Sequence, residues 1–91
     1  IANTYLNQKY ATAKDYAKQS LQIAQEIGKQ YAQATASLWL GKTNHELQDF
    51  ENALQFLLNA NNLFQSIKDN QKRYETLTEI GFLYRDWQTY D

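Results

Sequence analysis

The stretch LWLGKTNHELQDFENAL, Leu38 to Leu54, joins Trp-Leu-Gly, a polar segment and then Phe-x-x-Ala-Leu. A helical hairpin explains this combination, because small residues allow two helices to approach closely where they cross. Gly41 and Ala53 are small at the expected crossing, and Leu57 would fill the space beside them. The stretch therefore predicts two antiparallel helices that are joined by a short polar turn.

Composition extends this prediction to the whole chain. Ninety-one residues allow one domain at most, and the absence of proline with abundant Ala, Leu, Gln, Glu and Lys predicts an all-α fold. A net charge of −1 offers no basic excess for phosphates, so nucleic acid is not an expected partner. The chain has no cysteine, which suits a reducing compartment, and we expect a cytoplasmic location. No apolar run approaches the ~20 residues that span a membrane.

A repeat of forty residues connects two segments of the chain. Small and apolar residues between positions 13 and 27 keep their character between positions 53 and 67. Leu40-Gly41 likewise recurs as Ile80-Gly81. The matching pairs are Ala13/Ala53, Tyr16/Phe56, Ala17/Leu57, Ser20/Ala60, Ile23/Leu63, Ala24/Phe64 and Ile27/Ile67, and the aromatic series Tyr10, Phe50 and Tyr90 continues the register.

The spacing within each unit is i, i+3, i+4 and i+7, which is typical of one face of an α-helix. It predicts helices at 1–7, 10–28, 31–47, 50–68 and 71–86, with Asp49 as an N-cap and Gly28 as a C-cap. Residues 1–91 then form a single array with a partial unit 1–30, a complete unit 31–70 and a partial unit 71–91. Because the chain lacks Met and starts within a helical pattern, we expect it to be a piece of a longer protein.

These residues resemble the tetratricopeptide repeat, whose pattern has Leu-Gly, then Tyr, then Ala and an aromatic residue. The resemblance implies an α-solenoid of antiparallel helix hairpins with a right-handed superhelix. Three features depart from the family: a period of forty rather than 34 residues, Ser37 in place of the first aromatic residue, and the absence of proline. Other helical-hairpin repeats therefore remain an alternative. The matching residues are Ile1, Ala2, Tyr5, Tyr10, Ala13, Ala17 and Ser20, then Leu40, Gly41, Phe50, Ala53, Leu57 and Ala60, then Leu77, Ile80, Gly81, Tyr84 and Tyr90.

In this family the first helix of each pair lines a concave groove that holds a peptide or a helix of a protein partner. Trp39 could anchor such a partner, or it could pack against the neighbouring repeat. The charges beside it are mixed and could equally form an ordinary solvated helix surface. Carried over to this chain, the groove comprises Asn3, Thr35, Leu38, Trp39, Lys42, His45, Glu46, Glu75, Phe82 and Arg85.

One use of the family's groove is a clamp for the carboxylate at the end of a chaperone tail. The clamp requires asparagines on the first two units and basic residues on the third. Asn3 matches, but Trp39 stands at the second position, and Glu75 and Glu79 replace the basic residues. Two carboxylates would repel an anionic tail, so we expect no binding of this kind.

Catalytic motifs are not completed in the sequence. His45-Glu46 begins like a zinc-protease motif, but the second histidine would fall at Asp49, and His45 is the only histidine in the chain. The sequence therefore predicts no enzyme, no cofactor and no metal site. A structural spacer or self-association segment of a larger signalling protein is the alternative function, in which uncapped ends of the array pair to form a homo-oligomer.

Overall fold

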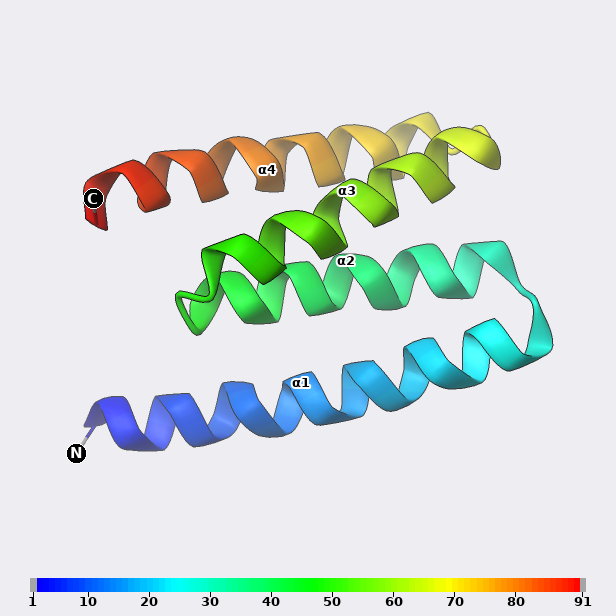
Figure 1. The fold of residues 1–91 in the computed structure, drawn as a ribbon. Coiled ribbons are helices and arrows are strands. Elements are labelled where there is room, and N and C mark those ends of the chain that lie inside the picture. The colour runs from blue at the N-terminus through cyan, green and yellow to red at the C-terminus, as the bar shows by residue number, and fades with distance from the viewer. Residues whose placement is uncertain (1, 91) are drawn as a thin grey trace.

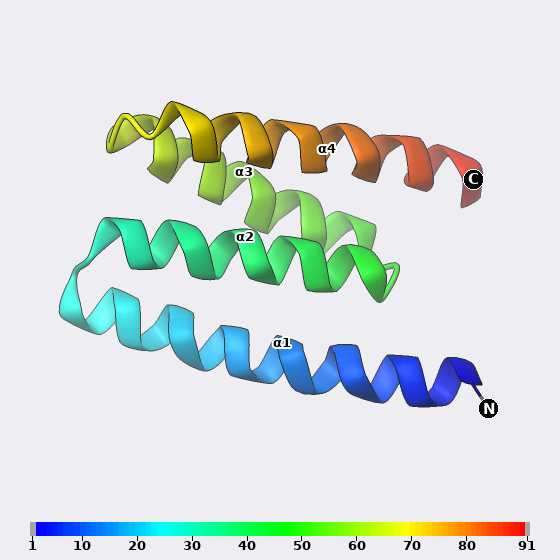
Figure 2. The ribbon, with the colours of Figure 1, turned by 180° about the vertical axis from the view of Figure 1, so that it is seen from behind.

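The computed structural model describes the backbone of residues 2–90 and the side chains of residues 8–89. This part of the chain is all-helical and contains α1 (Ala2–Ile27), α2 (Gln30–Glu46), α3 (Phe50–Ser66) and α4 (Asn70–Tyr90). Consecutive helices run antiparallel and stack in chain order, so that α1 and α4 lie at opposite ends (Figures 1 and 2). None of these four helices has the length and apolar character needed to cross a bilayer.

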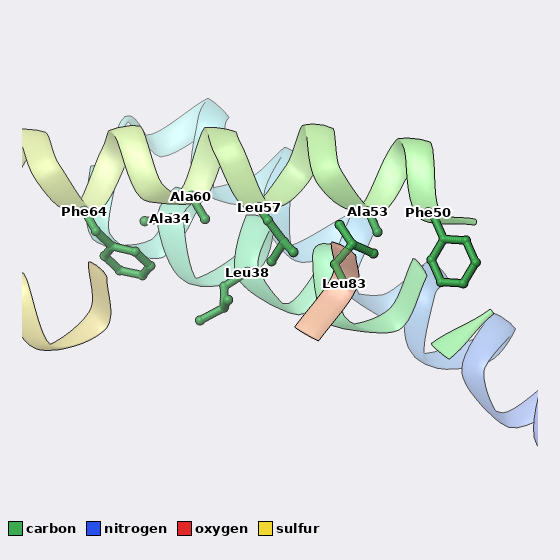
Figure 3. Close-up of a cluster of buried hydrophobic side chains, with 8 residues drawn as sticks. All are labelled: Ala34, Leu38, Phe50, Ala53, Leu57, Ala60, Phe64 and Leu83. Atoms are coloured by element: carbon green, nitrogen blue, oxygen red, sulfur yellow. The ribbon is translucent and has the colours of Figure 1, made fainter. Parts of the chain in front are cut away.

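The core lies chiefly where α3 packs between α2 and α4. One face of α3 is buried because its small and large apolar residues recur at helical spacing. Side chains from both neighbouring helices meet this face (Figure 3). The core cluster consists of Phe50, Ala53, Leu57, Ala60 and Phe64 from α3, Ala34 and Leu38 from α2, and Leu83 from α4.

The crossing of α2 and α3 is as close as the Leu38–Leu54 stretch predicts. A Cβ atom added to Gly41 would lie 2.5 Å from Leu57 Cγ and 3.3 Å from the backbone nitrogen of Leu57. Real side chains do not tolerate the first of these separations. Glycine at position 41 therefore allows the two helices to touch at this point, and the predicted hairpin is confirmed for residues 30–66.

The three corners between helices share one conformation and recur every twenty residues. Gly28, Gln48 and Lys68 have φ values of 70°, 64° and 60°. In each corner the next amide donates a hydrogen bond back to the carbonyl five residues earlier, as Asp49 N does to Asn44 O at 2.9 Å. This is the Schellman ending of a helix, for which glycine is the preferred residue. The predicted C-cap at Gly28 is confirmed.

The predicted break between helices 1–7 and 10–28 is wrong, because α1 continues through residues 8 and 9. The repeat register suggested a corner at Gln8, forty residues before the corner at Gln48. A left-handed residue other than glycine costs about 1–2 kcal/mol, and packing against a neighbouring helix must offset that cost. Among the described residues α1 packs only on α2, so a corner at Gln8 has no such compensation.

The other boundaries differ from prediction by a few residues. The largest difference is at α4, which extends to Tyr90 rather than ending at residue 86. Trp87 stacks on Phe50 with ring centroids 5.9 Å apart, and this contact holds the additional turn against α3. Asp49 lies at the N-cap position of α3, but its carboxylate accepts a hydrogen bond from Asn52 Nδ2 at 2.8 Å rather than from a backbone amide.

Candidate functional site: a groove between α1 and α2

A groove with a volume of about 710 Å³ runs between α1 and α2. It is open along one side and its walls are mostly apolar. Alanines form much of the surface, and three large aromatic side chains stand beside them while remaining more than half exposed. The residues that line it are Tyr10, Ala13, Tyr16, Ala17 and Ser20 from α1, and Tyr31, Ala32, Thr35, Ala36, Trp39, Lys42, Thr43 and Glu46 from α2.

Three polar side chains of the groove make contacts within the chain. Thr35 donates a hydrogen bond to the Tyr31 carbonyl at 2.9 Å, and Thr43 donates one to the Trp39 carbonyl at 2.8 Å. Lys42 Nζ lies 5.4 Å from the centroid of the Trp39 ring, which is within cation–π range. The groove therefore offers chiefly apolar area and aromatic rings, and its chemistry suits the apolar face of a helix.

Four of the predicted groove residues line this groove, namely Thr35, Trp39, Lys42 and Glu46. The prediction is wrong for Leu38 and His45, whose exposed fractions are only 3% and 9%. Leu38 belongs to the core cluster, and the His45 ring contacts Phe50 edge-on at 6.0 Å. Both residues lie on the face of α2 that α3 covers.

The predicted residues of α4 lie away from this groove, and the side chain of Asn3 lies outside the described ones. Glu75 forms an ion pair with Lys42 at 3.1 Å. Phe82 and Arg85 are exposed, and the Arg85 guanidinium lies 5.0 Å from the Phe82 ring centroid. The surface that α2 and α4 share is therefore bridged by a side-chain contact between the two helices, and a smaller hollow lies where the ends of both helices meet Phe50.

Ion pairs between α2 and α4 explain why the mixed charges of the sequence do not form an open binding surface. His45 Nε2 donates to the Asp86 carboxylate at 2.7 Å, and Arg85 contacts the same carboxylate at 3.2 Å. The hydrogen bond from His45, and then Arg85, hold the pKa of Asp86 below its ordinary value against the opposing effect of burial. Lys42, and then Lys72, lower the pKa of Glu75 in the same way.

We expect these pairs to weaken as the solution becomes acidic. A carboxyl group whose pKa is lowered by folding stabilises the folded state above its unfolded pKa, and this contribution is lost as pH falls through the folded pKa. Thermal unfolding of Glu75→Gln should therefore differ from wild type above the ordinary pKa of 4.5 and converge with it at lower pH. The difference near neutral pH should be about 0.5 kcal/mol, since the pair is partly exposed.

The matched control for this measurement is Glu79→Gln, which removes a carboxylate one turn further along α4 that does not belong to the Lys42 pair. Glu79→Gln should not reproduce the loss of stability that Glu75→Gln shows near neutral pH, because it leaves the pair with Lys42 intact. A pH-independent difference for Glu75→Gln would contradict the role given to the pair with Lys42.

Sequence reasoning missed the α1 wall of the groove and Tyr31. It assigned Tyr16 and its neighbours to packing, because the repeat register placed a folded-back helix 1–7 over them. Tyr16 is instead 67% exposed and Tyr31 is 51% exposed. Residues 7–10 contain no glycine or proline, but neither do the corners at Gln48 and Lys68, so the local sequence alone did not distinguish a continuous helix from a corner.

Comparisons with known proteins and a search for metal ligands add no further site. The sequence matches no protein-family model, and no curated protein or solved structure matches it at a significant level. Among the residues whose side chains are described, no three His, Cys, Asp or Glu gather closely enough to hold a metal ion.

Proposed function

We propose that the chain is a protein–protein interaction module of tetratricopeptide-like helix hairpins, arranged as an α-solenoid, which binds one helix of a partner in the groove between α1 and α2. The module would carry out no chemistry of its own. The single observation that supports this proposal is internal to the chain. The surface that corresponds to the groove forty residues later in the sequence, on α3 and α4, is covered by the helix α2.

The α1 wall of the groove corresponds to the core face of α3. Adding forty to Tyr10, Ala13 and Ala17 gives Phe50, Ala53 and Leu57, which are all buried. These three α3 residues belong to the core cluster that includes Ala34 and Leu38 of α2, and Leu57 meets Gly41. A helix therefore covers this surface in the second unit.

The α2 wall corresponds in the same way to the face of α4 that meets α2. Thr35 and Glu46 are equivalent to Glu75 and Asp86, which bind Lys42 and His45 of α2. In the second unit, α2 thus lies against both α3 and α4. The groove between α1 and α2 corresponds to the surface of α3 and α4 that α2 covers. The favoured ligand is therefore a helix that presents small and apolar residues as α2 does.

Selection from a displayed library of amphipathic helical peptides tests this function. Selected peptides should bind the wild-type chain, and the double substitution Tyr16→Glu with Trp39→Glu should weaken binding at least about tenfold, since it places charges on two exposed rings of the groove. Fluorescence anisotropy at low chain concentration measures the affinity.

The matched control is Leu58→Glu, which places the same charge on an exposed residue of α3 that does not line the groove. Leu58→Glu should bind the peptides as wild type does. Selection that yields no binding peptide, or peptides that bind the Tyr16→Glu, Trp39→Glu chain with unchanged affinity, would rule out the groove as a helix-binding site.

A further inference from the structure

The outer face of α4 is an exposed surface that mixes apolar and polar residues. Tyr74 is 72% exposed, Tyr84 is 48% exposed and Leu77 is 41% exposed. A Cβ atom added to Gly81, in the middle of this face, would meet nothing within 4 Å. The α4 outer face consists of Tyr74, Leu77, Thr78, Gly81, Tyr84 and Arg85.

The equivalent face of α2, forty residues earlier, is completely covered. Gly41 corresponds to Gly81, and α3 lies directly against Gly41 through Leu57. The six residues of α2 that match the α4 outer face are all buried, and they pack where α2 meets α3. They are Ala34, Ser37, Leu38, Gly41, Asn44 and His45.

Among the residues that the structure describes, the face of α4 that corresponds to the α3-facing side of α2 is uncovered, and the groove between α1 and α2 holds no helix. We propose that the helix bound in the groove is α4 of a second copy of this chain. The inference rests on the proposed function of the groove and names its partner. Copies would then associate head to tail, with α4 of one copy against α1 and α2 of the next.

One pair of side chains at this junction keeps its combined size, whereas at the closest crossing Gly41 with Leu57 corresponds to Gly81 with the smaller Ala17. In the core cluster of one chain the small Ala34 of α2 is combined with the large Phe64 of α3. At the junction the equivalent pair is Tyr74 of one copy with Ala24 of the next, so the large residue moves to the other helix. Total volume across the pair is roughly maintained, which is the condition under which a core tolerates substitution.

Charges at the junction are complementary as well. Within one chain His45 of α2 donates to Asp86 of α4 at 2.7 Å. The equivalent residues at the junction are Arg85 of one copy and Glu46 of the next, which bring a cation to a carboxylate in place of the histidine and the carboxylate. Both side chains are exposed in the single chain, where Arg85 contacts the neighbouring Asp86.

The ion pair between Lys42 of α2 and Glu75 of α4 is replaced at the junction by an apolar contact. Lys42 and Glu75 correspond to Phe82 and Thr35, so the junction places Phe82 of one copy on the groove wall of the next. Phe82 is 44% exposed in the single chain, and it would come close to the groove residue Trp39. An aromatic ring beside exposed aromatic surface favours association.

The distribution of exposed apolar side chains agrees with this assembly. Large exposed apolar residues lie on α1, α2 and α4, whereas Leu58 is the only one that α3 contributes among the described residues. Because each copy offers one α4 outer face and one groove at opposite ends, the interface is heterologous and does not close after two copies. The mass of the assembly should therefore rise with concentration beyond that of a dimer.

Sedimentation velocity on the 91-residue chain, from micromolar to millimolar concentrations, tests the assembly. The wild-type chain should show a mass that increases continuously past two copies. Leu77→Glu on the α4 outer face and Trp39→Glu in the groove should each weaken association at least about tenfold. Leu58→Glu, with the same change in charge, should associate as wild type does, and circular dichroism should show that all variants remain helical.

Mixing the two weakened variants is the decisive step. The Leu77→Glu chain keeps an intact groove and the Trp39→Glu chain keeps an intact α4, so an equimolar mixture should form a complex of two chains and no larger species. An interface between two α4 faces or between two grooves would instead let one of the two variants form dimers by itself, before mixing. Such a result would overturn the proposal, as would association that Leu77→Glu leaves unchanged.

Charge exchange adds an independent measurement. Arg85→Glu and Glu46→Arg should each reduce association, and the chain that carries both substitutions should recover it. A wild-type chain that remains monomeric at millimolar concentration would exclude the second copy as the partner. If helical peptides still bound that monomer and lost affinity on Trp39→Glu, the groove would keep its proposed function with a different partner.

Discussion

Substituting leucine for Gly41 should lower the free energy of unfolding by about 3 kcal/mol. Even a Cβ atom at this position would lie 2.5 Å from Leu57 Cγ, and the backbone nitrogen of Leu57 at 3.3 Å leaves little room for the side chain to yield. The two helices would have to separate where their contact is closest. Urea unfolding followed by circular dichroism, at a chain concentration that keeps the chain monomeric, measures the change.

Gly81 provides the matched control, because it stands forty residues later and a Cβ atom there meets nothing within 4 Å. Gly81→Leu should stabilise the monomer by about 0.5–1 kcal/mol, since leucine has a higher helix propensity than glycine. Combining Gly41→Leu with Leu57→Ala should cost less than the sum of the two single changes. Equal destabilisation at both glycines would refute the close crossing of α2 and α3.

Truncation of Phe64 to alanine should have the largest effect of any single substitution, about 3–5 kcal/mol. The ring is 0% exposed, it lies in the core cluster at the end of α3, and Tyr31 of α2 meets it edge-on at 6.2 Å. A loss of this size approaches the whole stability of many small domains. We therefore expect the Phe64→Ala chain to be largely unfolded at room temperature.

Leu58→Ala is the control for this truncation, because Leu58 lies on the same helix and is 42% exposed. Its stability should stay within about 0.5 kcal/mol of wild type. A Phe64→Ala chain that unfolds at the same urea concentration as Leu58→Ala would show that α3 does not bury its core face as described.

The sequence was sufficient to predict the helix hairpin of residues 30–66, because small residues and apolar spacing both indicate it. Gly28 also carried a clear signal, since its corner needs a positive φ. The corners at Gln48 and Lys68 have no such residue and adopt the same conformation. Their positions depended on the repeat register, and the same register incorrectly placed a corner at Gln8.

The candidate site was predictable on only one side for the same reason. Trp39 and Lys42 were expected in a groove because they lie off the packing face of α2. The opposite wall, with Tyr16, became accessible only once α1 was found to be continuous. Burial of His45 depended on Phe50 and Asp86 arriving from two other helices, a tertiary effect that local spacing does not encode.

The stacking of helices in chain order also governs how the chain reaches its folded state. Each described helix packs on its neighbours in sequence, and α2 and α4 supply the only contact between helices that are not consecutive. Contact order is consequently low, and low contact order is associated with fast folding because only short loops need to close. The hairpin of α2 and α3, whose two helices make the most extensive contact, is the natural nucleus, and α4 and α1 would then add to it from either side.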